Sequence, residues 1–336
     1  MRVFTSLDCL LHNPPFEILD GDKSEWLESP ARIEKIKQVL IKSERFKFEQ
    51  FIRKNTLLIS KLYTTDGTQF EKKVDIRVSE GRSSSGVIPE TFLHFNLVDS
   101  DDFSTHSVAQ VGRFAFDMTS TITKDTWKSA YAAVQCVLSG ANAIMNGGKT
   151  AYALVRPPGH HSTQDLCGGY CYLNHAAIAA NYLSGRKVIL DVDYHHGNGT
   201  EKIVKGNEDI LYVSLHADDD YPYYTGHRNA GNAINIPLPR TTTTDEYILA
   251  LQKAISHHIL PFRPDFLIIS FGVDTYNEDP IAGFSNVDRG MYTQMGRQIS
   301  QSKCPSLWIQ EGGYHMETLG DIVKDVLSSY MDVLEI

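Results

Sequence analysis

The stretch Asp-Val-Asp-Tyr-His-His-Gly-Asn-Gly at residues 191–199 constrains this chain more than any other part of its sequence. It directly follows the apolar run Val188–Leu190, which predicts a buried β-strand. Burying carboxylates is costly unless they are paired or bind a cation. Because aspartates and histidines crowd the point where a buried strand ends, the stretch indicates a metal or catalytic site rather than a structural cluster.

Short apolar runs and amphipathic segments alternate along the rest of the chain. The runs predict strands at residues 3–4, 152–155, 187–190, 210–215, 266–271 and 307–309. Apolar residues at helical spacing predict helices that begin near residue 30 and that span residues 127–146, 174–183, 243–259, 287–299 and 322–334. Such alternation is typical of a mainly parallel sheet with helices on both faces, so we expect residues 1–336 to form one α/β domain.

Composition argues against several classes of function. The net charge of −9 argues against a nucleic-acid-binding protein, which needs a basic face. No apolar run approaches the length of a membrane-spanning helix, and the N-terminus lacks the apolar core of a signal peptide. The five cysteines are scattered, which favours reduced thiols over a disulfide framework. We therefore expect a cytoplasmic protein with neither a membrane nor a nucleic acid as its partner.

Polar clusters follow four of the predicted strands. They are His160-His161, the stretch Asp191–His195, Asp274 and Tyr314. In open α/β sheets, ligands bind at the carboxyl ends of the strands. Because the four clusters sit at equivalent strand ends, they predict one shared crevice.

Asp193, His195 and Asp274 are the residues that we expect to bind a metal. Side chains alternate along an extended backbone, so Asp191, Asp193 and His195 share one face at the strand end. With Asp274 they offer two carboxylates and one imidazole and leave a coordination position open, which is typical of catalytic zinc. The same ligands suit Fe(II) or Mn(II), so the identity of the metal stays open.

His160 and His161 are not needed as ligands and can serve as a base and its electrostatic partner. The unperturbed pKa of histidine, about 6.5, suits general acid–base catalysis on a metal-activated water. Asp191 and Asn198 are the candidate groups that orient the two histidines. The hydroxyl of Tyr314 can donate a hydrogen bond to a carbonyl oxygen that becomes an oxyanion.

Aromatic residues near these clusters can wall a narrow slot for the substrate, although core packing explains them equally well. The candidates are Tyr170, which follows Gly168-Gly169, and Tyr221 and Tyr223 in the aromatic run at residues 221–224. Ser214, with the carbonyl groups around residues 191–195, can hold a monovalent cation, although nothing in the spacing requires one.

Together these motifs resemble the zinc-dependent deacetylase family, which includes histone deacetylases and acetylpolyamine amidohydrolases. They occur in the family's order and span about half of the chain. The matching segments are Arg156–His161, Gly168–Asn174, Asp191–Thr200, Ser214–His216, Gly272–Thr275 and Glu311–Tyr314. The resemblance implies an arginase-like, three-layer α/β/α fold around an eight-stranded, mainly parallel sheet.

The resemblance also implies a role for each site residue. The implied metal ligands are Asp193, His195 and Asp274 for zinc, and Asp191, Asp193, His195, Ser214 and Leu215 for potassium. The implied catalytic residues are His161 as general base and acid, His160 as its electrostatic partner, Asp191 and Asn198 as their orienting groups, and Tyr314 as the group that polarises the scissile carbonyl. The implied substrate contacts are the carbonyl of Gly169, Tyr170 in the tunnel wall and, on a shorter match, Arg32 at the acetate exit.

Within the family, the N-terminus, the length and the segment Val273–Pro280 most resemble the acetylpolyamine amidohydrolases. In those enzymes a long insertion helps to form a dimer that narrows the tunnel, and the segment 75–126, whose periodicity is poor, occupies that region. Taken by itself, this segment fits a solvated loop and a pocket wall or oligomer contact about equally well. It lacks the pair of glutamates that grips the distal ammonium of a polyamine, and Asp117 or Asp99–Asp102 is the candidate substitute.

The expected function is therefore the removal of acetyl groups from small, cationic N-acetylated polyamines by a zinc-dependent homodimer. The nearest alternative is a lysine deacetylase that acts on proteins or peptides. A two-manganese ureohydrolase of the same fold needs a second Asp-x-Asp motif, where this chain has Asp274 followed by Thr275. A non-catalytic binding or scaffold protein would not need the complete set of ligands, base and tyrosine.

Overall fold

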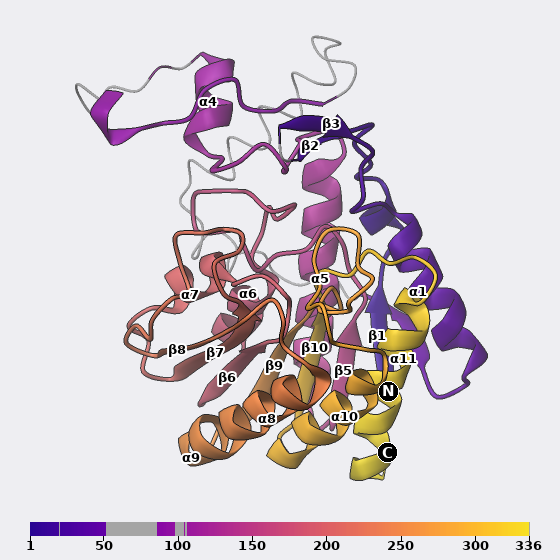
Figure 1. The fold of residues 1–336 in the computed structure, drawn as a ribbon. Helices are drawn as coiled ribbons and strands as arrows, with labels where there is room; N and C mark the ends of the chain where they lie inside the picture. Colours follow the sequence, from indigo (N-terminus) through magenta and orange to yellow (C-terminus); the bar gives the residue numbers. More distant parts are fainter. Residues whose placement is uncertain (20, 52–85, 98–103, 105, 336) are drawn as a thin grey trace.

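A parallel sheet of eight strands forms the centre of the molecule (Figure 1). The computed structural model describes residues 1–19, 21–51, 86–97, 104 and 106–335. In spatial order the strands are β4 (Lys47–Gln50), β1 (Arg2–Thr5), β5 (Thr150–Ala153), β10 (Ser306–Gln310), β9 (Phe266–Phe271), β6 (Lys187–Asp191), β7 (Ile210–Ala217) and β8 (Ala233–Leu238). Every neighbouring pair is parallel, so the expected eight-stranded α/β/α fold is confirmed.

Helices cover both faces of the sheet because side chains alternate between the two faces along each strand. Val188 and Leu190 of β6 belong to one hydrophobic core, while Ile189 belongs to the other. The helices that close the first core are α1 (Ala31–Lys42), α8 (Thr244–Ala254), α10 (Gly290–Ile299) and α11 (Leu319–Leu334). Those that close the second are α5 (Thr126–Met145), α6 (His175–Tyr182) and α7 (Asn198–Val204).

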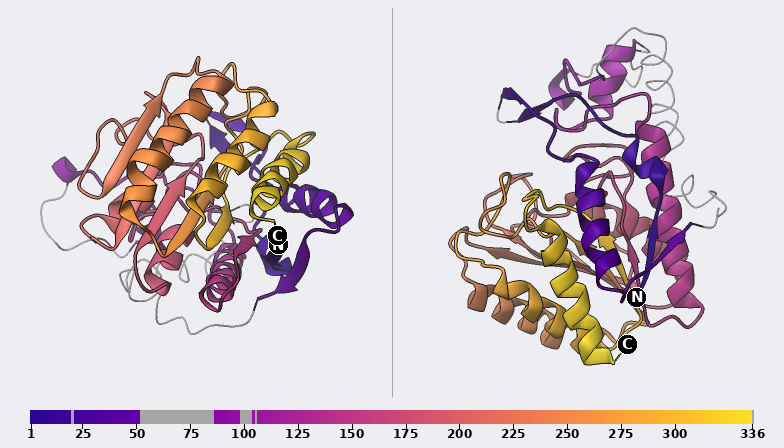
Figure 2. Two further views of the ribbon diagram at one scale, coloured as in Figure 1. Left: turned by 90° about the horizontal axis from the view of Figure 1, so that it is seen from below. Right: turned by 90° about the vertical axis from the view of Figure 1, so that its right-hand side faces the viewer.

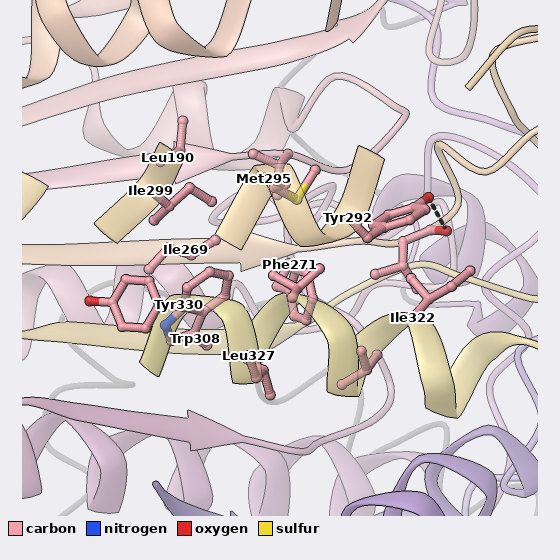
Figure 3. Packing of buried hydrophobic residues seen from close by; sticks show 14 of the residues in the cluster. Leu190, Ile269, Phe271, Tyr292, Met295, Ile299, Trp308, Ile322, Leu327 and Tyr330 are labelled. Atoms are coloured by element: carbon pink, nitrogen blue, oxygen red, sulfur yellow. Dashed lines mark hydrogen bonds between the residues drawn. The ribbon is translucent and has the colours of Figure 1, made fainter. Parts of the chain in front are cut away.

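Large aromatic side chains fill the core between the sheet and α11. The ring of Trp308 on β10 packs edge-on against Phe271 of β9 and Tyr330 of α11, at centroid distances of 5.1 and 5.0 Å (Figure 3). All three side chains are fully buried. Burying an apolar side chain of this size stabilises a fold by roughly 1.5–3 kcal/mol. This packing fixes the strands whose carboxyl ends carry the polar clusters.

Most predicted elements are present, with boundaries that differ by a few residues. Strand β5 ends at Ala153 where residue 155 was predicted. Helix α10 begins at Gly290 where residue 287 was predicted, and helix α11 begins at Leu319 where residue 322 was predicted. The side chains of Thr243 and Glu246 form a capping box at the start of α8. Beyond α8 the chain continues as a π-helical turn, Ile255–Ile259, and as α9 (Leu260–Phe262), where a single helix was expected.

Strands β4 and β8 and helix α7 are among the elements that have no counterpart among the predicted ones. Strand β4 lies at the edge of the sheet and has one apolar residue, Phe48, among its four positions. In β8, Asn235 and Pro237 interrupt the apolar run. Helix α7 begins at Asn198, inside the stretch whose polar residues indicated a site rather than a helix. Short or interrupted patterns of this kind carry too little periodicity to be recognised.

A small hairpin and a short helix lie beyond the carboxyl ends of the strands, away from the two chain termini, which lie close together (Figures 1 and 2). The hairpin pairs β2 (Glu17–Leu19) with β3 (Asp22–Ser24), and the helix is α4 (Ser107–Arg113). The expectation of an irregular segment 75–126 is therefore wrong for the residues of α4. Residues 75–85, 98–103 and 105, and with them the cluster Asp99–Asp102, lie outside the described residues.

None of the helices in the described part of the chain is both long enough and apolar enough to cross a membrane. The five cysteines, all of them described, are free thiols, and four of them are buried.

Candidate active site

The three expected metal ligands, Asp193, His195 and Asp274, lie together at the carboxyl ends of neighbouring strands. Asp193 and His195 follow β6, and Asp274 follows β9, which pairs with β6 in the sheet. One ligand atom from each residue lies within 4.8 Å of the other two. The Nδ1 atom of His195 is 3.4 Å from Asp193 Oδ1 and 3.4 Å from Asp274 Oδ2. The fold therefore brings together residues that are far apart in the sequence.

These three residues fit a divalent cation. Burial, together with the charge of Asp193, raises the pKa of the Asp274 carboxyl to about 7. Asp274 Oδ1 accepts a hydrogen bond of 3.0 Å from the backbone N–H of Tyr194, whereas Oδ2 is buried without a hydrogen-bond partner among the described residues. A cation beside Oδ2 would pair this oxygen and offset the repulsion between the two carboxylates. The oxygen and nitrogen donors, with no thiolate, suit Zn²⁺, Fe²⁺ or Mn²⁺.

A second buried group, His160, Cys171 and Glu311, also brings three potential ligand atoms within 4.8 Å of one another. Glu311 Oε2 already accepts hydrogen bonds from the backbone N–H groups of Gly159 (2.7 Å) and His160 (3.3 Å). Burial raises the pKa of the Cys171 thiol well above its ordinary value, which disfavours the thiolate form that binds metals. We therefore assign the candidate metal site to the first group.

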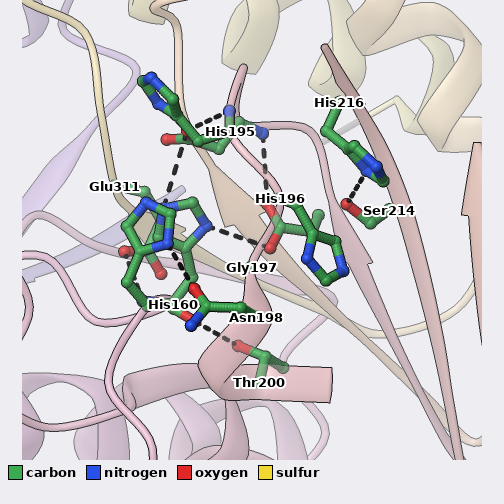
Figure 4. Close-up of polar contacts among 12 residues, drawn as sticks. His160, His195, His196, Gly197, Asn198, Thr200, Ser214, His216 and Glu311 are labelled. Atoms are coloured by element: carbon green, nitrogen blue, oxygen red, sulfur yellow. Dashed lines mark hydrogen bonds and ion pairs between the residues drawn. The ribbon is translucent and has the colours of Figure 1, made fainter. Parts of the chain in front are cut away.

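His160 and His161 lie side by side, with ring centroids 4.0 Å apart, and each contacts its own orienting group. His160 Nδ1 is 3.2 Å from Asp191 Oδ2. His161 Nδ1 donates a hydrogen bond of 2.7 Å to Asn198 Oδ1, which leaves Nε2 as the ring nitrogen with the free lone pair. Figure 4 shows His160 and Asn198 within this polar network. Each predicted orienting residue is thus in contact with the histidine expected for it.

The surroundings give the two histidines opposite charge states. Burial by itself lowers the pKa of His160, but the carboxylates of Asp193 and Asp191 outweigh it and raise this pKa to about 10. Burial, followed by the charges of His160 and His195, lowers the pKa of His161 well below its ordinary value. At neutral pH a cationic His160 therefore lies beside a neutral His161, and a neutral imidazole can accept a proton.

Tyr314 follows β10 and lines the same cavity as the histidines. The guanidinium carbon of Arg32 lies 4.6 Å from the centroid of the Tyr314 ring. Arg32 also donates hydrogen bonds to the carbonyl oxygens of Gly313 (2.7 Å) and Glu311 (2.6 Å), so it holds the segment that carries the tyrosine. Burial raises the pKa of Tyr314 well above its ordinary value, so its hydroxyl stays protonated. Arg32 itself is buried and does not line the cavity.

A cavity of about 340 Å³ leads from the hairpin to the metal cluster and the two histidines. It is bordered on the hairpin side by the apolar residues Ile18 and Leu19. The predicted substrate contacts in its wall are Asp117, Gly169, Tyr170, Tyr221 and Tyr223. These residues come from three separate loops, so only the folded chain forms a continuous wall.

Gly169 packs directly against the proposed base. Its φ is +55°, and a Cβ atom at this position would lie 2.3 Å from His161 Cδ2. The backbone N–H of Gly169 donates a hydrogen bond of 2.8 Å to Asp117 Oδ2. The hydroxyl of Tyr221 donates to the same oxygen at 2.6 Å. Asp117 therefore joins two sides of the cavity wall, and Gly169 allows the wall to approach the histidine.

Ser214 and Leu215, expected at a potassium site, lie on β7 next to β6. Ser214 is in register with Asp191 across the two strands. The Ser214 hydroxyl is 2.9 Å from His216 Nδ1 (Figure 4). The residues expected to bind potassium are therefore neighbours, while the binding itself stays a prediction.

Two residues that had no assigned role also hold the aspartates. The backbone N–H of Gly312 donates a hydrogen bond of 2.9 Å to Asp193 Oδ2. The hydroxyl of Tyr212 donates a hydrogen bond of 3.0 Å to Asp191 Oδ2. Gly312 belongs to a recognised motif, so a signal for it existed. Tyr212 lies in an apolar strand, where the sequence offers no sign of a polar contact.

A buried ionic cluster lies behind the site. Glu28 forms ion pairs with Arg32 (2.8 Å) and Arg156 (2.7 Å), and all three side chains are buried. Arg156 also donates a hydrogen bond of 3.0 Å to the carbonyl oxygen of Cys9. Breaking such a cluster would leave an unpaired buried charge, which is costly. These contacts therefore hold the N-terminal region against the motif segments of the site.

Comparison with known proteins places the chain in one family. The histone deacetylase domain model matches residues 26–330. Acetylpolyamine amidohydrolase 1 of Pseudomonas aeruginosa is 35% identical over 340 residues, covering 96% of each chain, and acetylpolyamine amidohydrolase of Mycoplana ramosa is 32% identical over 97% of this chain and 98% of its own. A crystal structure of acetylpolyamine aminohydrolase from Burkholderia pseudomallei superposes with a TM-score of 0.91 at 28% identity, covering 98% of each chain.

These similarities span almost the whole chain, and they agree with the resemblance that the motifs had indicated. Deacetylases of this family are generally metal-dependent, which is consistent with the cluster Asp193, His195 and Asp274. The chain therefore belongs to the histone deacetylase domain family, and it is a deacetylase, a hydrolase.

Proposed function

We propose that the protein removes acetyl groups from small, cationic N-acetylated polyamines with the help of zinc. The observation that carries this proposal is the end-to-end similarity to acetylpolyamine amidohydrolases, which covers 96% of this chain and 96% of the Pseudomonas aeruginosa protein. The cavity supports it, since about 340 Å³ accommodates a slender amine more readily than a folded protein segment.

Asp193, His195 and Asp274 would hold the zinc ion. When bound there, zinc would polarise the substrate carbonyl and lower the pKa of a water molecule. The residues of the chain supply the remaining chemistry. The protonated hydroxyl of Tyr314 donates a hydrogen bond to the carbonyl oxygen as negative charge develops on it.

His161 moves the proton in this proposal. Its neutral imidazole accepts a proton on Nε2 from the attacking water, because Nδ1 is engaged with Asn198. The same nitrogen then delivers the proton to the leaving amine as the amide C–N bond breaks, so acetate and a free amine result. His160, held cationic by Asp191 and Asp193, adds positive charge beside the reaction centre and keeps His161 neutral before the attack.

Several further expectations belong to the same proposal. The protein acts as a homodimer in the cytoplasm, and its single domain carries an insertion, about residues 75–126, at the tunnel mouth or the dimer contact. Residues Asp117, Met118 and Thr119 of that segment line the cavity, which supports a place at the mouth. Potassium would bind beside β6 and β7 through Asp191 and Ser214, which are in register.

A comparison of kcat/KM for acetylputrescine, acetylspermidine and an acetyl-lysine peptide tests the proposed substrate. We expect a clear preference for the acetylated amines, because the narrow cavity admits a slender chain. Metal analysis of the purified protein should find one zinc ion per chain. A preference for the peptide would instead favour the lysine deacetylase, and two manganese ions per chain would favour a ureohydrolase.

A further inference from the structure

The mouth of the cavity carries an arginine on its solvent side. Arg240 lines the cavity and follows β8, and 65% of its side chain is exposed. It forms an ion pair with Asp220, another lining residue, whose side chain is only 8% exposed. The Nε and Nη2 atoms of Arg240 donate hydrogen bonds of 2.9 and 2.6 Å to Asp220 Oδ2. The backbone N–H of Ser285 donates to the Arg240 carbonyl at 2.9 Å, which fixes the backbone there.

Protein donors already use most of the acceptor capacity of Asp220. Besides Arg240, its Oδ2 atom accepts a hydrogen bond of 2.9 Å from the Tyr194 hydroxyl. Its Oδ1 atom accepts one of 2.7 Å from the backbone N–H of Tyr221. The negative charge of Asp220 is thus balanced by Arg240, and the exposed end of this pair is the guanidinium group.

Asp117, which also lines the cavity and is less exposed than Arg240, is in a different situation. Its carboxylate accepts hydrogen bonds from Tyr221, Gly169 and Thr119, all of which are neutral donors. No lysine or arginine within the described ranges forms an ion pair with it. Tyr221 reaches Asp117 with its hydroxyl and Asp220 with its backbone N–H, so the two carboxylates lie at opposite ends of one tyrosine.

A substrate chain that leaves the active site therefore meets the unpaired carboxylate of Asp117 first and the exposed guanidinium end of the Arg240–Asp220 pair next. An ammonium group near Asp117 is attracted, whereas a second ammonium farther out meets the guanidinium of Arg240. Like charges within a few ångströms repel even in a partly solvated environment. Discrimination through such a repulsive contact is a common source of specificity.

We propose that Arg240 is a charge gate that makes the enzyme select acetylated amines with one ammonium group over those with two or more. This inference rests on the proposed function, because it concerns the amine part of an acetylated polyamine. It narrows that function to monoacetylated diamines.

Acetylputrescine and N8-acetylspermidine form a matched pair of substrates for the test, since the second extends the first by a cationic aminopropyl group. We expect Arg240→Gln to raise kcat/KM for N8-acetylspermidine about three- to fivefold, mainly through KM, the size expected of an exposed charge contact. The same substitution should change kcat/KM for acetylputrescine and for the neutral amide N-butylacetamide by less than about twofold. Arg240→Lys, which keeps the charge, should behave as the wild type.

Arg289→Gln serves as the control variant. Arg289 also pairs with an aspartate on the surface, Asp325 at 2.8 Å, but it does not line the cavity. This control should leave the ratio of kcat/KM for acetylputrescine and N8-acetylspermidine unchanged. High salt should reduce the wild-type preference for acetylputrescine, because screening weakens exposed charges.

The proposed role of Arg240 is overturned if Arg240→Gln leaves the ratio of kcat/KM for the two cationic substrates unaltered. It is also overturned if the substitution changes kcat/KM for the neutral amide by the same factor. Should the wild type cleave only acetyl-lysine peptides, the proposed function fails, but the gate remains testable. The same ratio is then measured with peptides that carry one or two additional lysines. An unaltered ratio in that series also rejects the gate.

Discussion

The hydroxyl of Tyr314 has no hydrogen-bond partner among the residues that the structure describes, although the rest of this residue is held firmly. Arg32 lies against its ring, and its backbone N–H donates a hydrogen bond of 2.7 Å to Asp279 Oδ2. A protonated hydroxyl kept free in this way can donate to a substrate oxygen without first losing another bond. Preorganised donors of this kind account for much of the rate enhancement in acyl-transfer enzymes.

Replacement of Tyr314 by phenylalanine should lower kcat by about 10²–10³-fold, the usual effect of losing one oxyanion donor. The zinc content should not change, because Tyr314 is not one of the proposed ligands. Steady-state kinetics and metal analysis of the same sample measure both quantities. Near-normal turnover in this variant would remove Tyr314 from the mechanism.

Tyr330→Phe is the matched control for the loss of a buried tyrosine hydroxyl. The Tyr330 hydroxyl donates a hydrogen bond of 2.9 Å to Ser306 in the core under α11, away from the cavity. This variant should lose about 1 kcal/mol of unfolding free energy and keep its kcat. A comparable fall in kcat for both variants would mean that stability, not catalysis, explains the Tyr314 result.

At the scale of elements, the site is built from the segments that follow strands, and glycines let these segments approach one another. Gly312, after β10, has no side chain between its backbone and the aspartates, and a Cβ atom there would lie 2.3 Å from Asp274 Oδ2. In the same way, a Cβ atom on Gly169 would lie 2.3 Å from His161 Cδ2. These separations are shorter than a nonbonded carbon contact, so any side chain would displace a functional group.

Gly169→Ala should reduce kcat strongly, by at least about tenfold, because the new methyl group displaces His161 from the position in which it can act. Gly206→Ala is the control, since Gly206 also has a positive φ, +81°, but nothing lies within 4 Å of an added Cβ. Backbone strain should cost both variants roughly 1 kcal/mol of unfolding free energy. Gly169→Ala should lose more than Gly206→Ala, because its methyl group also overpacks against His161. Equal kcat values for the two variants would argue against the contact with His161.

At the scale of the whole molecule, the metal cluster connects distant parts of the chain. Asp193 and Asp274 are held by the backbone N–H groups of Gly312 and Tyr194, so β6, β9 and β10 meet at this point. Two buried carboxylates that share one site repel each other when no cation lies between them. Binding of a metal should therefore stabilise the fold as well as enable the chemistry.

Removal of the metal with a chelator should lower the melting temperature, and added zinc should restore it. At a free zinc concentration one hundred times Kd, linkage predicts a stabilisation of about 2.7 kcal/mol. Asp274→Asn should make the melting temperature insensitive to zinc, because it removes a ligand charge. Thermal unfolding followed with and without chelator measures the effect, and a variant that still responds fully to zinc would contradict the assignment of Asp274.

The sequence by itself determined the fold class and the residues at the centre of the site. Apolar runs and helical spacing predicted the strands from β5 onward, except β8, since buried elements carry a strong local pattern. The position of Asp193, His195 and Asp274 directly after strands predicted that they meet, because the carboxyl ends of parallel strands share one edge. The motif order led to the family, which the comparisons then confirmed.

The tertiary structure alone decided the contacts between residues that no local pattern relates. Glu28 bridges Arg32 and Arg156, and Arg240 balances Asp220, yet nothing in the sequence indicates these pairings. The physical reason is that an ion pair depends on the distance and burial of two groups, which the fold sets and sequence spacing does not. Local patterns therefore identified the chemistry, whereas the folded chain determined which charges face the substrate.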